Sequence, residues 1–147
     1  MKIAITSDHA GIGLKSFLVK HLQEKQVEVI DMGPYEDASV DYPDYAKKMC
    51  QKVLDKEAEL GIAICGTGIG MSMACNKVPG IRAALCSESY SARLTRLHNN
   101  SNVLCLGARV TGEELAMDIV DTYISTDFSG DERHERRIGK LEGGINE

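Results

Sequence analysis

The residues best suited to chemistry lie in one short segment, Cys65-Gly66-Thr67-Gly68-Ile69-Gly70. The thiol ends an apolar run typical of a buried strand, and three glycines follow it within five residues. Because glycine leaves the backbone bare, successive N–H groups of such a loop can turn toward one anion or developing oxyanion. A tight turn above a core cysteine would have the same local pattern, so this segment alone leaves both interpretations open.

Three further polar residues follow other strand-like runs. Asp8 and His9 come after the first run, and Arg109 comes after the last. Each has a plainer explanation: a helix N-cap for Asp8, a solvated turn for His9 and a surface cation for Arg109. In a parallel sheet, however, all of them would meet the glycine loop at the carboxyl edge, where ligands of open α/β sheets bind. That convergence favours a binding or catalytic site.

Two groups of basic residues lie elsewhere in the sequence. His98 falls at the expected end of a helix, where the dipole favours its protonated form, and it could serve only to complement that dipole. Arg133 and Arg137 are four residues apart, so they share one helical face and repel each other. A phosphate between them would remove this repulsion, because guanidinium groups match phosphate geometry. A solvated face balanced by nearby carboxylates is the alternative.

Nucleotide and metal motifs do not account for the glycine-rich segments. Gly66-x-Gly68-x-Gly70 lacks the GxGxxG spacing of a dinucleotide fold, and it follows the third strand-like run instead of the first. The segment around Gly13 differs from a P-loop because Leu14 separates the glycine from Lys15. No cluster of His, Cys, Asp or Glu has metal-ligand spacing. We therefore expect neither a metal nor a cofactor.

The elements that must position these residues alternate along the chain. Strand-like apolar runs cover residues 2–6, 27–30, 61–65, 81–85 and 103–106. Helical patterns cover about residues 14–25, 43–54, 71–77, 87–98, 111–120 and 129–141. The alternation predicts an α/β fold with three α/β/α layers, Rossmann-like, around a five-stranded parallel sheet with right-handed crossovers. The length of 147 residues predicts a single domain over 1–147.

Polar signatures predict where several helices begin and end. Ser87 precedes one helix, and Thr111 and Ser129 each begin a capping box. Asn99 and Asn100 predict the end of a helix, because asparagine tolerates the left-handed conformation. The apolar residues expected to lie in the last two helices are Leu115, Ile119 and Val120 in one and Ile138 and Leu141 in the other.

Composition excludes several classes of protein. The net charge of −5 and the isoelectric point near 5.4 argue against general binding to nucleic acid or to an anionic membrane. No apolar run approaches 18 residues, the length that predicts a membrane span. Five cysteines without a CxxC pair indicate reduced thiols and a reducing compartment. We therefore expect a cytoplasmic protein.

Short motifs extend along almost the whole chain. In order, they are Ser7-Asp8-His9-Ala10-Gly11, Asp41-Tyr42-Pro43, Ile64 to Gly70, Asn76-Lys77, Gly80-Ile81-Arg82, His98-Asn99-Asn100, Gly107-Ala108-Arg109 and Arg133-His134-x-x-Arg137. Together they resemble type B ribose-5-phosphate isomerase, whose family includes allose-6-phosphate isomerase and the subunits of galactose-6-phosphate isomerase. The resemblance implies an aldose–ketose isomerase of the non-oxidative pentose phosphate pathway, which interconverts ribose 5-phosphate and ribulose 5-phosphate through ring opening and an enediolate.

The resemblance also implies a role for each catalytic residue. Cys65 would be the base that moves a proton between C1 and C2, and His98 would protonate the ring oxygen to open the furanose. Asp8 and Thr67 would assist ring opening or the movement of a proton between O1 and O2. Some members of the family lack this cysteine and use a glutamate a few residues later. Residues 71–74 contain no carboxylate, which leaves Cys65 as the candidate base.

Substrate binding is implied for a larger set of residues. The amides of the glycine loop would stabilise the enediolate, two arginines and one histidine would hold the phosphate, and the others would contact the sugar. The set is Asp8, His9, Tyr42, Gly66, Thr67, Gly68, Ile69, Gly70, Asn99, Arg109, Arg133 and Arg137. The family pattern further implies a homodimer with shared active sites, or a tetramer.

Two other functions remain open at this stage. The first is isomerisation of a six-carbon sugar phosphate such as allose 6-phosphate or galactose 6-phosphate, because the depth of the pocket cannot be deduced from sequence. The second is a non-catalytic phosphate- or nucleotide-binding module, which would bind its ligand tightly without turnover. The presence of Cys65, His98 and the arginine pair in one chain favours the isomerase.

Overall fold

The computed structural model, which describes residues 1–143, has one central parallel sheet. Its strand order is β2-β1-β3-β5-β4, and every neighbouring pair is parallel. The strands are β1 (Lys2–Ser7), β2 (Glu28–Asp31), β3 (Leu60–Cys65), β4 (Ala83–Leu85) and β5 (Val103–Gly107). The predicted five-stranded parallel sheet is thus confirmed.

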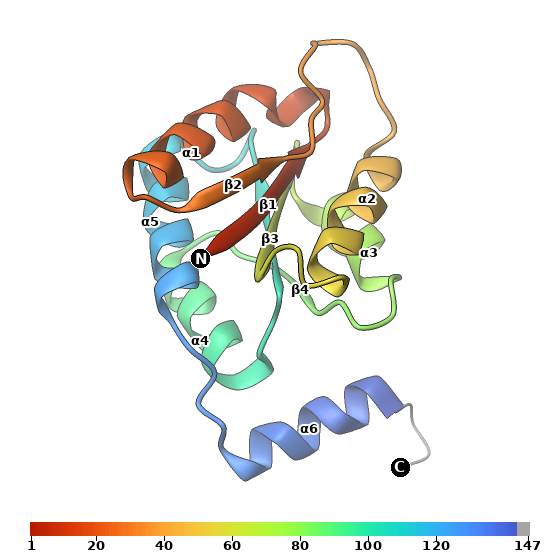
Figure 1. Cartoon of the computed structure of the whole chain (residues 1–147), viewed down its shortest axis with the longest axis vertical. Helices are drawn as coiled ribbons and strands as arrows, with labels where there is room; N and C mark the ends of the chain where they lie inside the picture. The colour runs from red at the N-terminus through yellow and green to blue at the C-terminus, as the bar shows by residue number, and fades with distance from the viewer. Residues whose placement is uncertain (144–147) are drawn as a thin grey trace.

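Helices cover both faces of the sheet and complete the predicted α/β/α layers (Figure 1). A short 3₁₀ turn, η1 (His9–Gly11), precedes the first helix. The helices are α1 (Ile12–Glu24), α2 (Tyr42–Leu54), α3 (Ile69–Asn76), α4 (Ser89–Asn99), α5 (Glu113–Ser125) and α6 (Glu132–Gly143). One buried cluster joins α1, α4 and α5 to one face of the sheet, and a second joins α2 and α3 to the other.

The central strands are buried because helices cover them on both sides. Every residue of β3 and β5 is buried, as their continuous apolar runs predict. The fourth run differs from the prediction. It contributes only a three-residue edge strand, and Leu85 at its end is 42% exposed. Arg82 stays outside this strand, with its backbone N–H donating to the side chain of Asn102.

Three predicted helix starts are wrong by one or two residues. α4 is capped by Glu88, whose carboxylate accepts from the Ser91 amide, and not by Ser87. The N-cap of α5 is Gly112, and the side chain of Thr111 before it is buried. α6 begins after Asp131, so Ser129 lies two residues too early. The predicted end of α4 is confirmed, since Asn100 adopts the left-handed conformation with φ of 44°.

Helix α6 lies apart from the layers of the sheet, across the lower end of the molecule (Figure 1). It contacts the main body through α4 and through an ion pair between Glu142 and Arg82. Leu141 is 70% exposed, although the sequence pattern predicts it on a packing face, and Leu115 of α5 is also largely exposed. Among residues 1–143, no helix is long and apolar enough to cross a membrane.

Candidate active site

The glycine loop turns sharply between β3 and α3. Gly68 has φ of 79°, a conformation that side chains disfavour, and its amide donates to Sγ of Cys65 at 3.2 Å. A Cβ on Gly68 would come within 2.9 Å of the Leu106 carbonyl carbon on β5. The loop therefore fits against β5 only with glycine at this position, and Sγ is fixed at the base of the loop.

The loop presents backbone donors at the start of α3. This helix begins at Ile69, so the first-turn amides of Gly70 and Met71 have no acceptor within the helix. The Ile69 amide donates to Oγ1 of Thr67 at 3.3 Å. Bare amides at a helix N-terminus stabilise negative charge. The predicted oxyanion site therefore has its donors beside the thiol of Cys65.

Asp8 and His9 meet the loop from the end of β1. The Asp8 amide donates to the Ile64 carbonyl at 2.9 Å, and its carboxylate accepts from the Ala10 amide at 2.9 Å. Asp8 is thus the N-cap of η1, and it is also 7% exposed next to β3. Nδ1 of His9 accepts from the Val40 amide at 3.3 Å, which leaves Nε2–H of a neutral ring as a donor.

Two side chains stand against the glycines of the loop. The guanidinium of Arg109 lies so close that a Cβ on Gly66 would be 3.2 Å from its Nη1. The ring of Tyr42, at the start of α2, leaves only 2.7 Å between its Cζ and a Cβ on Gly70. The structure thus brings together the carboxyl-edge group, which we define as Asp8, His9, Tyr42, residues 65–70 and Arg109.

The other predicted residues gather at the opposite edge of the sheet. His98 and Asn99 end α4, and Arg133 and Arg137 lie on α6 beside them. The ring of His98 stacks on His134 of α6, with centroids 4.3 Å apart and an interplanar angle of 17°. We call His98, Asn99, Arg133 and Arg137 the amino-edge group.

The length of β5 separates the two groups. Cys65 pairs with Gly107, the last residue of β5. At the other end of β5, Arg82 lies beside the residues that precede Val103, and its guanidinium donates to the Asn99 carbonyl. Four steps along a parallel strand span about 13 Å. The residues proposed for proton transfer and those proposed for ring opening therefore do not converge within one chain.

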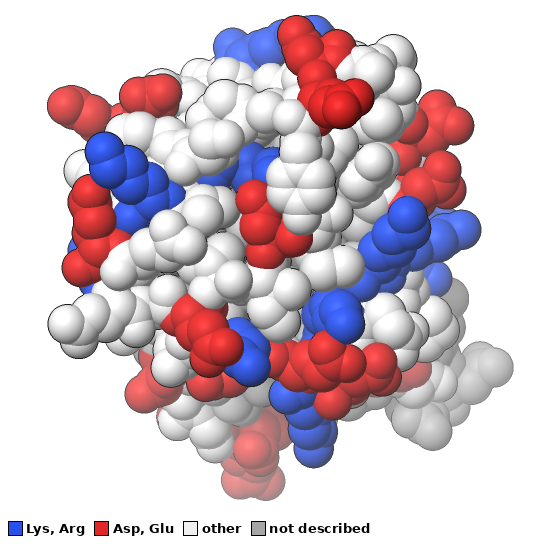
Figure 2. Space-filling view, turned by 45° about the horizontal axis from the view of Figure 1, so that its top comes forward, with Lys and Arg blue, Asp and Glu red and all other residues white. Residues whose placement is uncertain are grey.

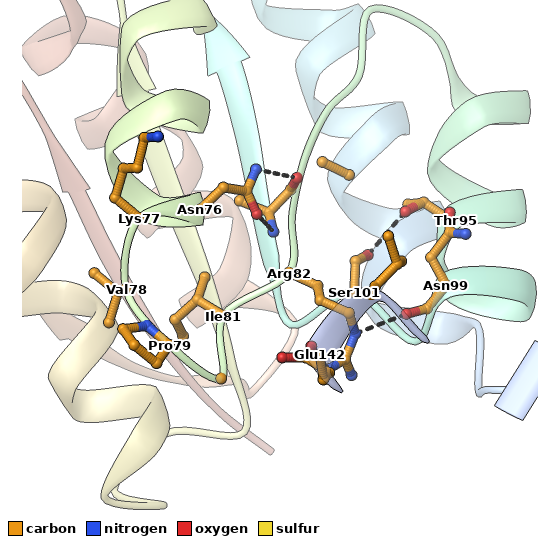
Figure 3. Close-up of a pocket in the computed structure, with 14 residues that line it drawn as sticks. Asn76, Lys77, Val78, Pro79, Ile81, Arg82, Thr95, Asn99, Ser101 and Glu142 are labelled. Atoms are coloured by element: carbon orange, nitrogen blue, oxygen red, sulfur yellow. Dashed lines mark hydrogen bonds and ion pairs between the residues drawn. The ribbon is translucent and has the colours of Figure 1, made fainter. Parts of the chain in front are cut away.

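Arg82 fastens the amino-edge group to the sheet (Figure 3). Its guanidinium donates to the carbonyls of Asn99 at 2.9 Å and Asn100 at 2.8 Å, and it pairs with Glu142 of α6 at 2.7 Å. Helix C-termini have unpaired carbonyls, so this arginine satisfies two of them and ties α6 to the same point. Arg82 and Asn99 also line a cavity of about 560 Å³ between α3, α4 and α6.

Arg82 and His134 lie within the sequence motifs, but no role is predicted for either from the sequence. A signal for His134 existed, because it lies four residues before Ile138 and therefore on the face expected to pack. It is 5% exposed, and its Nε2 has no hydrogen-bond partner among the described residues. Burial, aided by the positive charges of His98, Arg133 and Arg137, lowers the pKa of His134, and Asp131 opposes this shift.

The remaining cysteines are buried and free. Hydrogen bonding between neighbouring thiols and burial raise the pKa values of Cys50 and Cys75. Burial raises the pKa of Cys86 to about 11. These thiols pack as small apolar groups, as their positions in the core clusters show.

Acidic and basic side chains are interspersed over the face turned forward from the top of Figure 1 (Figure 2). Among residues 1–143, no cluster of His, Cys, Asp or Glu could hold a metal ion. A thiol beside an amide-rich helix start, on a Rossmann-like sheet, defines an α/β protein with a candidate site for acid–base chemistry on an anionic substrate.

Comparison with known proteins identifies the family. The sequence model of the ribose/galactose isomerase family matches residues 3–141. Ribose-5-phosphate isomerase B of Escherichia coli is 50% identical over 137 residues, which cover 93% of this chain and 91% of that protein. The chain therefore belongs to the ribose/galactose isomerase family.

Solved structures agree closely with this fold. A ribose 5-phosphate isomerase from Thermotoga maritima is 55% identical with a TM-score of 0.95, covering 97% of this chain and 98% of that one. Ribose-5-phosphate isomerase B from Mycoplasma genitalium, solved with bound ribulose-5-phosphate, is 45% identical with a TM-score of 0.91, covering 97% and 94% of the two chains.

Proposed function

We propose that this protein interconverts ribose 5-phosphate and ribulose 5-phosphate by aldose–ketose isomerisation in the pentose phosphate pathway. The family assignment and the similarity to named ribose-5-phosphate isomerases support the reaction. The observation that carries the proposal for the site is Sγ of Cys65 at the base of a loop whose next amides are helix N-terminal donors. This arrangement offers a base and an oxyanion site side by side.

Cys65 is proposed to transfer the proton. As the thiolate, it removes the proton from C2 of the open aldose, and the electrons move to the carbonyl oxygen at C1 to give an enediolate. The same thiol then returns the proton to C1, which yields the ketose. The amides of residues 66–70 stabilise the oxyanion, and Asp8 and Thr67 move the proton between O2 and O1.

The amino-edge group is proposed to open the ring and to hold the phosphate. His98 donates a proton to the ring oxygen of the furanose. Arg133 and Arg137, together with His9 of the carboxyl edge, hold the phosphate, because guanidinium and imidazole N–H groups donate to its oxygens. Asn99 and Arg109 contact the sugar, and Tyr42 lines the pocket beside Gly70.

The separation of the two groups supports a homodimer with shared sites. Since one chain keeps them at opposite edges of its sheet, the carboxyl edge of one copy must face the amino edge of another. A two-fold axis creates that contact twice. Exposed apolar side chains at both edges support the arrangement: Ile69, Leu85 and Val110 at one edge and Leu141 at the other.

The direct test is turnover of ribose 5-phosphate by the full chain with a chelator present. We expect ketose to form, and to form faster than from allose 6-phosphate or galactose 6-phosphate. Activity that disappears with chelator would contradict the proposal of metal-independent chemistry. Turnover of a six-carbon substrate alone would overturn the assignment of the pentose.

A further inference from the structure

His134 packs against one face of His98, the proposed acid of the ring-opening step. It is buried, on α6, and its ring lies flat against that of His98 at a centroid distance of 4.3 Å. Among residues 1–143, the histidine rings that make hydrogen bonds are those of His9 and His21, so no hydrogen bond orients the His98 ring. The stack on His134 is the contact that can set the orientation of this ring.

The geometry of the stack excludes a direct proton relay between the two rings. The N–H bonds of an imidazole lie in the ring plane, and the two planes are within 17° of parallel. A hydrogen bond from one ring to the other would need these bonds to point out of the plane. Nε2 of His134 has no partner among the described residues, so hydrogen bonding through this atom does not explain its burial. His134 therefore contacts His98 through the flat face of its ring.

The charges around the stack favour the neutral form of His134. Arg133 and Arg137 approach it from α6 itself, His98 approaches from α4, and Asp131 is the acidic group that opposes them. Burial and these positive charges lower the pKa of His134, which favours its neutral form. A neutral aromatic face beside an imidazolium is favourable, whereas a second cation would repel it.

We propose that His134 is a positioning residue that fixes the plane of the His98 imidazole for proton donation to the ring oxygen of the sugar. The proposal rests on the proposed role of His98 in ring opening. It extends that role to a buried residue that contacts the His98 ring.

Two substrates separate positioning from a general structural role. Ribose 5-phosphate is a furanose and must be opened, whereas ribulose 5-phosphate is open, because its 5-hydroxyl carries the phosphate. Exchange of the C1 hydrogen of ribulose 5-phosphate with deuterium from D₂O therefore reports proton transfer by Cys65 without ring opening. His134→Leu should slow conversion of ribose 5-phosphate about tenfold, part of the ~10²–10⁴ that a positioned acid contributes, and leave deuterium exchange unchanged.

His134→Phe keeps a planar ring and should restore most of the conversion rate. Arg136→Gln, an exposed change on the same helix, is the matched control and should leave both rates unchanged. Equal losses in conversion and in deuterium exchange for His134→Leu would show a structural role and overturn the proposal. Unchanged conversion in His134→Leu would overturn it as well.

A spectroscopic measurement keeps this inference distinct from the proposed function. The Hε1 resonance of His98 should carry a ring-current shift from His134, which His134→Leu removes and His134→Phe retains. If the wild-type protein fails to convert ribose 5-phosphate, the proposed function fails, and this resonance still decides whether the stack exists. An unchanged resonance in His134→Leu would disprove the stack.

Discussion

The two edges of the sheet hold their functional residues in different ways. At the carboxyl edge, the backbone sets the geometry: Cys65 pairs in register with Gly107, and Gly68 fits against β5 with no room for a side chain. At the amino edge, side chains set the geometry, because Arg82 and His134 connect α4 to α6. The residues proposed for proton transfer therefore lie in the core, whereas the two arginines proposed to bind phosphate depend on the docking of one exposed helix.

Substitution of Cys65 at the carboxyl edge is expected to lower turnover more than any other single change proposed below. Cys65→Ala should lower turnover of ribose 5-phosphate by about 10²–10⁴-fold, the contribution of a positioned base. Binding of ribulose 5-phosphate, measured by calorimetry, should change little, because the phosphate and sugar contacts remain. Full activity of the variant would assign proton transfer to another residue.

A glycine substitution tests the rigidity of the carboxyl edge. Gly68→Ala should cost about 1–3 kcal/mol in stability, because alanine is strained at positive φ and its Cβ would meet the Leu106 carbonyl. Turnover should fall as well, since the Gly68 amide positions Sγ of Cys65. Gly13→Ala in α1 is the control, because a Cβ there meets nothing within 4 Å. Chemical denaturation and kinetics on both variants give the comparison, and equal stability of the two would contradict it.

A milder substitution tests the docking of α6. Glu142→Gln removes the ion pair with Arg82, which is partly exposed and therefore worth about 0.2–1 kcal/mol. KM for ribose 5-phosphate should rise about twofold to fivefold, since the arginines proposed to bind the phosphate lie on this helix, and kcat should hold. Glu135→Gln, an exposed change on the same helix, should leave KM unchanged. A fall in kcat with constant KM would show that the docking of α6 does not contribute to phosphate binding.

The smallest expected effect is a dependence of α6 docking on pH. The pKa of His134 is lowered in the folded protein, so the unfolded chain binds its proton more tightly. The stability that burial of neutral His134 permits is therefore complete above the ordinary value of 6.5 and declines as pH falls toward the lowered pKa. Hydrogen exchange of α6 amides between about pH 5 and pH 7.5 should show faster opening at the acidic end. His134→Phe should remove this dependence, and an identical profile in both proteins would contradict the assignment.

The sequence predicted the sheet and the carboxyl edge better than the amino edge. Alternating apolar runs and helical patterns suffice for a parallel sheet, and strand ends then meet at one edge, which places Asp8, Cys65 and Arg109 together. The position of His98 also follows from topology, because a helix after a parallel strand must return to the amino edge. The capping prediction at Thr111 was wrong: its side chain is buried, and Gly112 is the N-cap of α5.

The placement of α6 could not be predicted from local pattern. No strand follows it, so chain connectivity does not fix its direction. Its one buried residue among those described, His134, is polar, and the exposed Leu141 was expected to pack. The contacts that dock this helix are a histidine stack and an ion pair, which depend on three-dimensional positions that periodicity does not encode.

Each active site is proposed to combine the carboxyl edge of one copy with the amino edge of another. Cys65→Ala and His98→Asn are each expected to be inactive as homodimers on ribose 5-phosphate. The mixed dimer, co-expressed with two affinity tags and purified through both, should recover about half of the wild-type activity, because one of its two sites is intact. A mixed dimer without activity would show that each chain carries its own complete site, and failure to recover any mixed dimer would contradict the assembly itself.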